Sequence, residues 1–184
     1  MRTFETEDFT YEPSHHVPFR DKAVLEQVRE IGPDDFRNHP NPNLDVEVVS
    51  KDALGSRFAD DLFGRIKKAG QAGEKLVLIL PQPWPFYANI AAMINEERID
   101  CRNLYTFNMD EYADEDGNTA PAEWAGSFQK AMFDNFFSLI DEDLRPPVDQ
   151  IHFPTADVLD HYNDMMQEVG GVDVCYGGIG WCGH

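Results

Sequence analysis

Apolar residues recur through most of this chain with the periods of helices and strands. The first long repeat places apolar residues four positions apart, at Leu54, Phe58, Leu62 and Ile66. This spacing predicts a helix with one buried face, which Ser50 or Asp52 can cap and which Gly70 and Gly73 end. The apolar run at 75–80 is continuous, as in a strand that is buried on both faces. The pattern therefore predicts a helix that leads into a central strand.

The alternation of strands and helices continues towards the end of the chain. Further strands are predicted at 46–49, 103–108, 149–153 and 172–176. Three further helices are predicted from apolar stripes. In the first of them Pro85 can occupy the first turn and the core positions are Ile90, Met93 and Ile94. The stripes of the other two are Trp124, Phe128, Ala131, Met132, Phe136 and Leu139, and then Leu159, Tyr162, Met166 and Val169. Strands that alternate with helices form parallel sheets through right-handed crossovers. We therefore expect an α/β fold, a doubly wound, mostly parallel, Rossmann-like sheet with helices on both faces.

The N-terminal part of the sequence differs from the rest. Residues 1–43 are rich in proline, histidine and charge, and only Val24, Leu25, Val28 and Ile31 form a short helical stripe. We expect an N-terminal arm or extension over 1–43 and an α/β domain over 44–184. A glycine-rich turn after a buried strand normally feeds a helix that covers the sheet, and the sequence stops in such a turn. Either another chain covers that edge or, as we favour, 44–184 is the N-terminal portion of a longer domain.

Composition narrows the class of partner. The formal charge of −19 and the pI near 4.4 argue against nucleic acid and anionic membranes. Three cysteines, an odd number, suggest reduced thiols and a cytoplasmic protein. The N-terminus lacks the apolar core of a signal peptide, and no run approaches the length of a membrane span. We expect a soluble protein with a core of ordinary size.

Candidate catalytic residues follow the predicted strand at 103–108. Asp110 and Glu111 fall just past its carboxyl end, the edge along which ligands bind in open α/β sheets. A carboxylate held there can abstract a proton from a carbon next to a carbonyl. The alternative is a solvated acidic loop, because the residues at 114–116 are also acidic. A calcium-binding EF-hand loop is rejected, because Tyr112 occupies the position of its first carboxylate.

The glycine-rich turn at 177–184 is a second candidate site. Gly178, Gly180 and Gly183 have the spacing of the dinucleotide fingerprint, but that fingerprint belongs on the first strand of its unit, with an acidic residue about 20 positions further on. A tight turn whose backbone N–H groups approach a ligand explains the same glycines. Cys182 and His184 lack further ligands at zinc spacing, and a histidine at this edge is well placed to shuttle protons. We expect no metal and no cofactor.

Two motifs together resemble one enzyme family. Residues 106–112 (TFNMDEY) and 177–184 (GGIGWCGH) resemble the glucosamine-6-phosphate deaminase/isomerase family, which is related to 6-phosphogluconolactonases, and the similarity covers roughly 44–184. The resemblance implies that Asp110 moves a proton between C2 and C1 of an amino sugar through an enolamine intermediate. It implies that His184 assists opening of the sugar ring and that hydrolysis of the resulting imine releases ammonia. By analogy, a homo-oligomer is expected.

The sequence departs from the family at three places. The segment at 81–85 (PQPWP) aligns with the family's phosphate loop, but proline has no N–H donor, so Gln82 and Trp84 suggest an unphosphorylated sugar-like ligand. The alternative is that this segment is a rigid structural turn. Cys182 stands where the family has an aspartate, and a largely neutral thiol cannot supply that charge. The segment after the family's histidine is absent, so the chain is not expected to be a competent catalyst by itself.

The leading hypothesis is an amino-sugar phosphate isomerase/deaminase-like protein, which converts glucosamine 6-phosphate to fructose 6-phosphate and ammonia, or acts on a related sugar. One alternative is a non-catalytic sugar-binding or regulatory relative. Another is a nicotinamide-dependent oxidoreductase, in which substitution of Gly180 would abolish binding of the cofactor. The expected catalytic residues are Asp110, His184, Glu111 and Cys182, and the expected substrate contacts are Gln82, Trp84, Gly177, Gly178 and Gly180.

Overall fold

The computed structural model describes residues 21–179 of the 184-residue chain. The described residues form two compact units, one of which spans Ser50–Gly178. The other unit contains the residues up to Val49 and takes in Ile179. The assignment of 1–43 to an arm and 44–184 to a domain stays a prediction.

The unit that ends at Val49 contains two short helices, α1 (Lys22–Arg29) and α2 (Pro33–Arg37). The predicted helical stripe lies in and just after α1, and Asp21 caps this helix by accepting hydrogen bonds from the N–H groups of Ala23 and Val24. The strand predicted at 46–49 is wrong. Residues 44–50 have no regular structure, because this segment pairs with no strand and leaves Val48 41% exposed, so its alternating valines gain little burial.

The unit Ser50–Gly178 is built on a four-stranded sheet in the order β3-β2-β1-β4, and every pairing is parallel. The strands are β1 (Leu76–Leu80), β2 (Leu104–Asn108), β3 (Ile151–His152) and β4 (Val174–Cys175). The chain runs outward from β1 through β2 to β3 and then returns to the other side of β1. This reversal makes the sheet doubly wound, which confirms the predicted fold class.

The helices of this unit follow the predicted stripes, with differences at their ends. They are α3 (Lys51–Ala72), α4 (Tyr87–Glu97), α5 (Phe128–Asn135) and α6 (Tyr162–Glu168), with single 3₁₀ turns η1 (Phe137–Leu139), η2 (Val148–Gln150) and η3 (Leu159–His161). Ser50 caps α3 through a 3.2 Å hydrogen bond from the Ala53 N–H, and Gly73 ends it in the left-handed conformation with φ 67°. Gly70 lies inside α3 and not at its end, and its missing side chain leaves room for the Asp100 carbonyl, which would lie 2.6 Å from a Cβ there.

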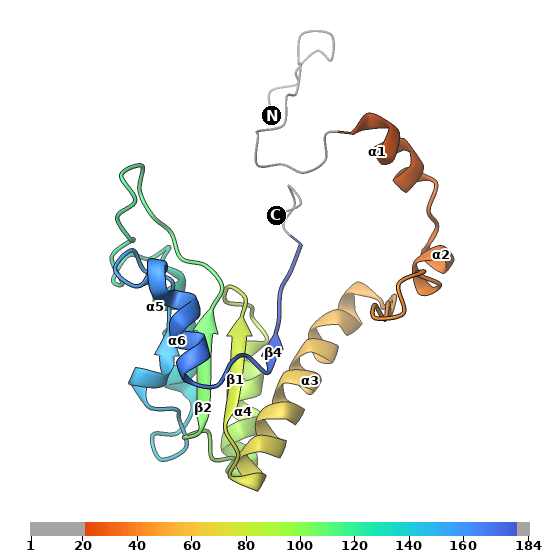
Figure 1. Ribbon diagram of the computed structural model, residues 1–184. Helices are drawn as coiled ribbons and strands as arrows, with labels where there is room; N and C mark the ends of the chain where they lie inside the picture. The colour runs from red at the N-terminus through yellow and green to blue at the C-terminus, as the bar shows by residue number, and fades with distance from the viewer. Residues whose placement is uncertain (1–20, 180–184) are drawn as a thin grey trace, which may run out of the picture. The chain divides into compact units, whose positions relative to one another are not determined.

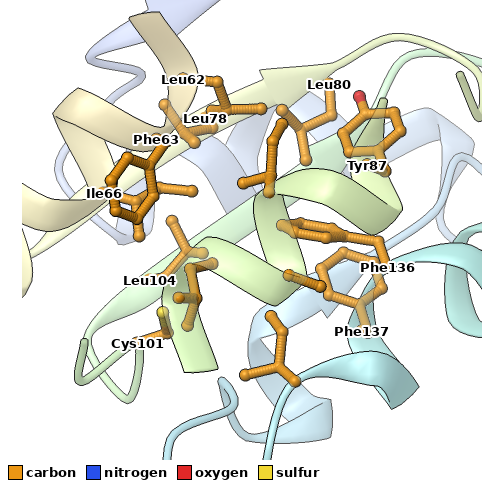
Figure 2. Close-up of a cluster of buried hydrophobic side chains, with 14 of the residues drawn as sticks. Leu62, Phe63, Ile66, Leu78, Leu80, Tyr87, Cys101, Leu104, Phe136 and Phe137 are labelled. Atoms are coloured by element: carbon orange, nitrogen blue, oxygen red, sulfur yellow. The ribbon is translucent and has the colours of Figure 1, made fainter. Parts of the chain in front are cut away.

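The two faces of the sheet bury clusters of very different size. The larger cluster gathers side chains from α3, α4, β1, β2, α5 and η1, and Figure 2 shows Leu62, Leu78 and Phe136 among its members. The smaller cluster, on the face that α6 covers, has three buried members among residues 21–179, Val77, Phe107 and Tyr162. Helices therefore cover both faces, as predicted (Figure 1).

The helix predicted over Trp124 to Leu139 is shorter than its apolar stripe. Only Phe128–Asn135 is α-helical, and the stripe continues as the 3₁₀ turn η1. Trp124 and Leu139 are 48% and 45% exposed, so these two residues lie outside the core to which the periodicity assigned them. Within residues 21–179, no helix is long and apolar enough to cross a membrane.

Two glycines of α3 provide a matched test of packing around the loop that follows β1. A Cβ built at Gly55 would overlap the ring of Phe86, whereas a Cβ at Gly64 would meet nothing within 4 Å. We expect Gly55→Ala to displace this ring and lower the free energy of unfolding by about 1–3 kcal/mol. Gly64→Ala should raise it by about 0.4–1 kcal/mol, because alanine lowers the entropy of the unfolded chain. Urea denaturation measures both, and equal effects would contradict the packing of Phe86 on α3.

Candidate active site at the carboxyl edge of the sheet

The loops after β1, β2 and β4 meet at the carboxyl edge of the sheet. Because β1 lies between β2 and β4, this edge holds the point where the strand order reverses, which is where open α/β sheets bind ligands. A Cβ built at Gly177 would lie 3.4 Å from Cε of Met109, and one at Gly178 would lie 4.0 Å from Cζ2 of Trp84. The structure thus brings Gly177 close to the residue that precedes Asp110, and Trp84 close to Gly178.

Asp110 is exposed and lines an open cavity of about 240 Å³. The Met109 N–H donates a 2.9 Å hydrogen bond to the Leu80 carbonyl, so the pairing of β1 with β2 continues to the residue before Asp110. The cavity lies between the acidic loop and the segment after β3, and its other lining residues are Met109, Glu111, Tyr112, Ala113, Gly117, Thr119, Pro154, Ala156 and Leu159. A carboxylate in this position can reach a bound molecule.

The carboxylate of Glu111 is directed at the N-terminus of α5. Its Oε1 accepts hydrogen bonds from the N–H groups of Tyr112 (2.8 Å) and Phe128 (3.0 Å). Its Oε2 accepts hydrogen bonds from the Ser127 hydroxyl and the Gln129 N–H, both at 2.8 Å. Burial favours a higher pKa for Glu111, but these four donors outweigh burial and hold the pKa below its ordinary value. The arrangement places Glu111 next to the candidate base as a helix cap.

This pKa shift predicts how the stability contributed by Glu111 depends on pH. A carboxyl group whose pKa is lowered by folding stabilises the folded state above its unfolded pKa and loses that contribution as the pH falls through the folded pKa. Glutamine resembles the protonated acid. We therefore expect Glu111→Gln to lower the free energy of unfolding most above about pH 5, and the difference from wild type to shrink towards pH 3. Urea denaturation across this range checks the trend, and a difference that grows towards acid would contradict it.

The proline-rich loop after β1 is tied into the core. The Trp84 ring packs edge-on against Phe58 at 5.2 Å between ring centroids and against Phe86 at 6.2 Å. The buried Tyr87 hydroxyl donates a 3.3 Å hydrogen bond to the Pro81 carbonyl. Trp84 therefore has a packing role in addition to any contact with a ligand, whereas Gln82 is exposed.

A cluster that the sequence did not indicate anchors the end of β4. The Tyr176 hydroxyl donates a 2.5 Å hydrogen bond to Oδ2 of Asp61 on α3, and the Arg65 Nε–H donates to the same oxygen at 2.9 Å. The hydrogen bonds from Arg65 and Tyr176 lower the pKa of Asp61. Because Tyr176 directly precedes Gly177 and Gly178, this cluster fixes the start of the glycine-rich turn. The four-residue spacing of Asp61 and Arg65 is visible in the sequence, but their partner on β4 is not.

Three of the predicted site residues, Gly180, Cys182 and His184, lie outside the described residues. The acidic loop itself is a compact turn, in which the Asp114 carboxylate accepts hydrogen bonds from the N–H groups of Asp116 (3.0 Å) and Asn118 (2.8 Å). The roles assigned to all the site residues stay predictions.

Comparisons with known proteins agree with the two motifs. No protein-family model matches the chain. It is 36% identical to a glucosamine-6-phosphate deaminase of Caenorhabditis elegans over 129 residues, which cover 65% of this chain and 45% of that protein. It is 35% identical to a glucosamine-6-phosphate deaminase of Parabacteroides distasonis over 139 residues, which cover 71% of this chain and 49% of that protein. The chain spans about half the length of these curated relatives.

Solved structures show the same fold. A monomeric glucosamine-6-phosphate deaminase superposes with a TM-score of 0.58 at 24% identity, over 73% of this chain and 54% of that one. A 6-phosphogluconolactonase of Thermotoga maritima superposes with a TM-score of 0.55 at 15% identity, over 72% and 59% of the two chains. The curated relatives confirm the similarity to glucosamine-6-phosphate deaminases that the two motifs indicated, and the solved structures confirm the fold.

Proposed function

We propose that this chain carries the proton-transfer site of an amino-sugar phosphate isomerase/deaminase-like enzyme. The observation that carries the proposal is the exposed Asp110 carboxylate, which lies just past the carboxyl end of β2 and lines a cavity between the acidic loop and the segment after β3. The homology to glucosamine-6-phosphate deaminases supports the class of substrate. The substrate is a small molecule, and the charge of −19 leads us to propose no nucleic acid and no membrane as partners.

The chemistry needs one base that serves two neighbouring carbons. Asp110 takes the proton from C2 of the open-chain amino sugar; the electron pair of the broken C–H bond forms a C1–C2 double bond as the C1–O1 π bond breaks and O1 takes up a proton from water, which gives an enolamine. The same carboxyl group then returns the proton to C1 as the nitrogen lone pair forms a C2–N double bond in place of the C1–C2 double bond, and loss of an N–H proton to water leaves an imine at C2. Water then adds to the imine carbon, and loss of ammonia yields the ketose. His184 is proposed to assist the ring opening that precedes these steps, and the backbone at Gly177 and Gly178 to approach the sugar.

The loop at 81–85 bears on whether the sugar carries a phosphate. Three of its five residues are prolines, so only Gln82 and Trp84 carry backbone N–H donors there. Phosphate is commonly held by several convergent N–H groups of a turn. We therefore propose that this loop contacts the sugar through the Trp84 ring and the Gln82 amide, and that an unphosphorylated amino sugar is a substrate to test beside glucosamine 6-phosphate.

The decisive experiment is proton NMR in D₂O, with the protein added to glucosamine 6-phosphate or to free glucosamine. Loss of the C2–H signal on addition of the protein is the expected result for a proton-transfer site, and the sugar that exchanges faster is the preferred one. Saturable binding without exchange would contradict catalysis and favour the non-catalytic sugar-binding alternative. Two observations also favour that alternative, the packing of Trp84 into the core and the presence of Cys182 in place of the family's aspartate. Absence of both binding and exchange would contradict the proposal for this chain.

A further inference from the structure

We propose that Glu111 is a positioning residue, which sets the place of Asp110 in the cavity by joining the loop after β2 to the N-terminus of α5. The sequence suggested a catalytic role for Glu111 because it adjoins Asp110. The geometry points to a different role, since all four hydrogen bonds of its carboxylate go to Ser127, the first two residues of α5 and the neighbouring Tyr112. This inference deepens the proposed function and rests on it.

The hydrogen bonds at the start of α5 show how completely Glu111 is used there. A helix leaves its first backbone N–H groups without partners inside the helix. Glu111 accepts from those of Phe128 and Gln129, and the Ser127 hydroxyl accepts from that of Lys130 at 3.2 Å. The Ser127 hydroxyl also donates to Glu111, and Ser127 is fully buried. The Glu111 carboxylate therefore caps the first two residues of α5, and the Ser127 hydroxyl caps the third.

Asp110 lies between two anchored neighbours. On one side, the Met109 N–H is bound to the Leu80 carbonyl at the end of β1. On the other side, Glu111 is bound to α5, and the Tyr112 ring packs against Trp124 at 5.5 Å and against Phe128 at 4.7 Å between ring centroids. The sheet thus fixes the backbone before Asp110, and Glu111 fixes the backbone after it. Without the second anchor, the base would be attached to the sheet at one end only.

Two variants at the start of α5, measured side by side, separate the positioning of Asp110 by Glu111 from the contribution of Glu111 to the stability of the helix. Glu111→Gln replaces one acceptor oxygen by an NH₂ group that faces N–H donors, so two of the four hydrogen bonds are lost. Ser127→Ala weakens the same helix start, but leaves the bonds from Tyr112, Phe128 and Gln129 to Glu111. We expect Glu111→Gln to lower kcat for C2–H exchange by about 10- to 100-fold with KM changed by less than about threefold, because a small displacement of a reacting group costs rate more than binding.

Ser127→Ala is expected to keep kcat within about threefold of wild type, although it also destabilises the helix start. Equal losses of kcat in the two variants would overturn the inference, because Glu111 would then act only through the stability of α5. An unchanged kcat in a folded Glu111→Gln variant would also overturn it.

A measurement on the free protein keeps this inference testable whether or not the proposed reaction occurs. In wild type and in Ser127→Ala, we expect the ¹⁵N order parameter of the Asp110 amide to stay at about 0.85, and in Glu111→Gln to fall below about 0.6. An Asp110 amide that stays ordered in Glu111→Gln would overturn the positioning role. Wild-type protein without C2–H exchange would instead overturn the proposed function, and the order parameters alone would then decide whether Glu111 holds this loop.

Discussion

Asp110→Asn is expected to slow C2–H exchange of the preferred amino sugar by about 10²- to 10⁴-fold, the range that a positioned general base contributes. Asparagine has nearly the same shape as aspartate, but its amide oxygen is far too weak a base to take the C2 proton. The side chain is exposed at the edge of the sheet, so the hydrophobic core does not depend on its charge. Rate constants from the decay of the C2–H signal in D₂O, at saturating sugar, measure the change directly.

The control for this variant removes the same charge from the same loop. Asp116 is exposed and is not among the residues that line the cavity, so Asp116→Asn should change the rate by less than about twofold, as expected for a surface substitution. Line broadening of the sugar signals should show that Asp110→Asn still binds. Equal losses in the two variants would mean that the charge of the acidic loop matters and not the base at Asp110. Loss of binding in Asp110→Asn would show that the carboxylate contributes to affinity and would leave proton transfer unassigned.

The long elements could be predicted because their burial follows one period over many residues. Leu62 and Ile66 face the core along α3, and the run at 76–80 is enclosed by helices on both faces of the sheet. The apolar period gave wrong predictions of burial where apolar residues lie at the margin of the core. Leu54 in the first turn of α3 is 51% exposed and Leu159 at the start of η3 is 59% exposed, because helix ends extend beyond the sheet that they cover.

The site could be predicted only for residues whose position follows from the adjacent strand in the sequence. The position of Asp110 follows from the end of β2, which lies at Asn108 as the sequence predicted. The cap formed by Glu111 and Ser127 joins residues 16 positions apart, and the bond from Tyr176 to Asp61 joins residues 115 positions apart. Neither contact is marked by a repeating pattern in the sequence, because both depend on how the loops fold back in three dimensions. The sequence therefore indicated which edge carries the chemistry but not which side chains hold that edge together.

Phe107→Ala is expected to lower the free energy of unfolding by about 3–5 kcal/mol, as large-to-small substitutions of buried aromatic residues do. Phe107 is fully buried in β2, and its ring stacks on His152 of β3 at 4.6 Å and meets the Tyr162 ring of α6 edge-on at 5.5 Å between centroids. The cluster on this face has three buried members among the described residues, so the Phe107 ring supplies a large share of its buried apolar surface. Urea denaturation followed by far-UV circular dichroism measures the loss.

Two companion variants separate the contribution of the Phe107 ring from other effects. Phe36→Ala makes the same chemical change on α2, where the side chain is 43% exposed, and should change the free energy of unfolding by less than about 0.5 kcal/mol. Tyr162→Phe removes only the hydroxyl, which donates to the Asn108 carbonyl at 2.9 Å and to the His152 carbonyl at 3.1 Å, and should cost about 0.5–1.5 kcal/mol. A loss below about 1 kcal/mol for Phe107→Ala would mean that the α6 face is not part of the cooperative core. The strand that leads to Asp110 would then depend on the α3 and α4 face alone, and the candidate base would be held by one layer of the fold instead of two.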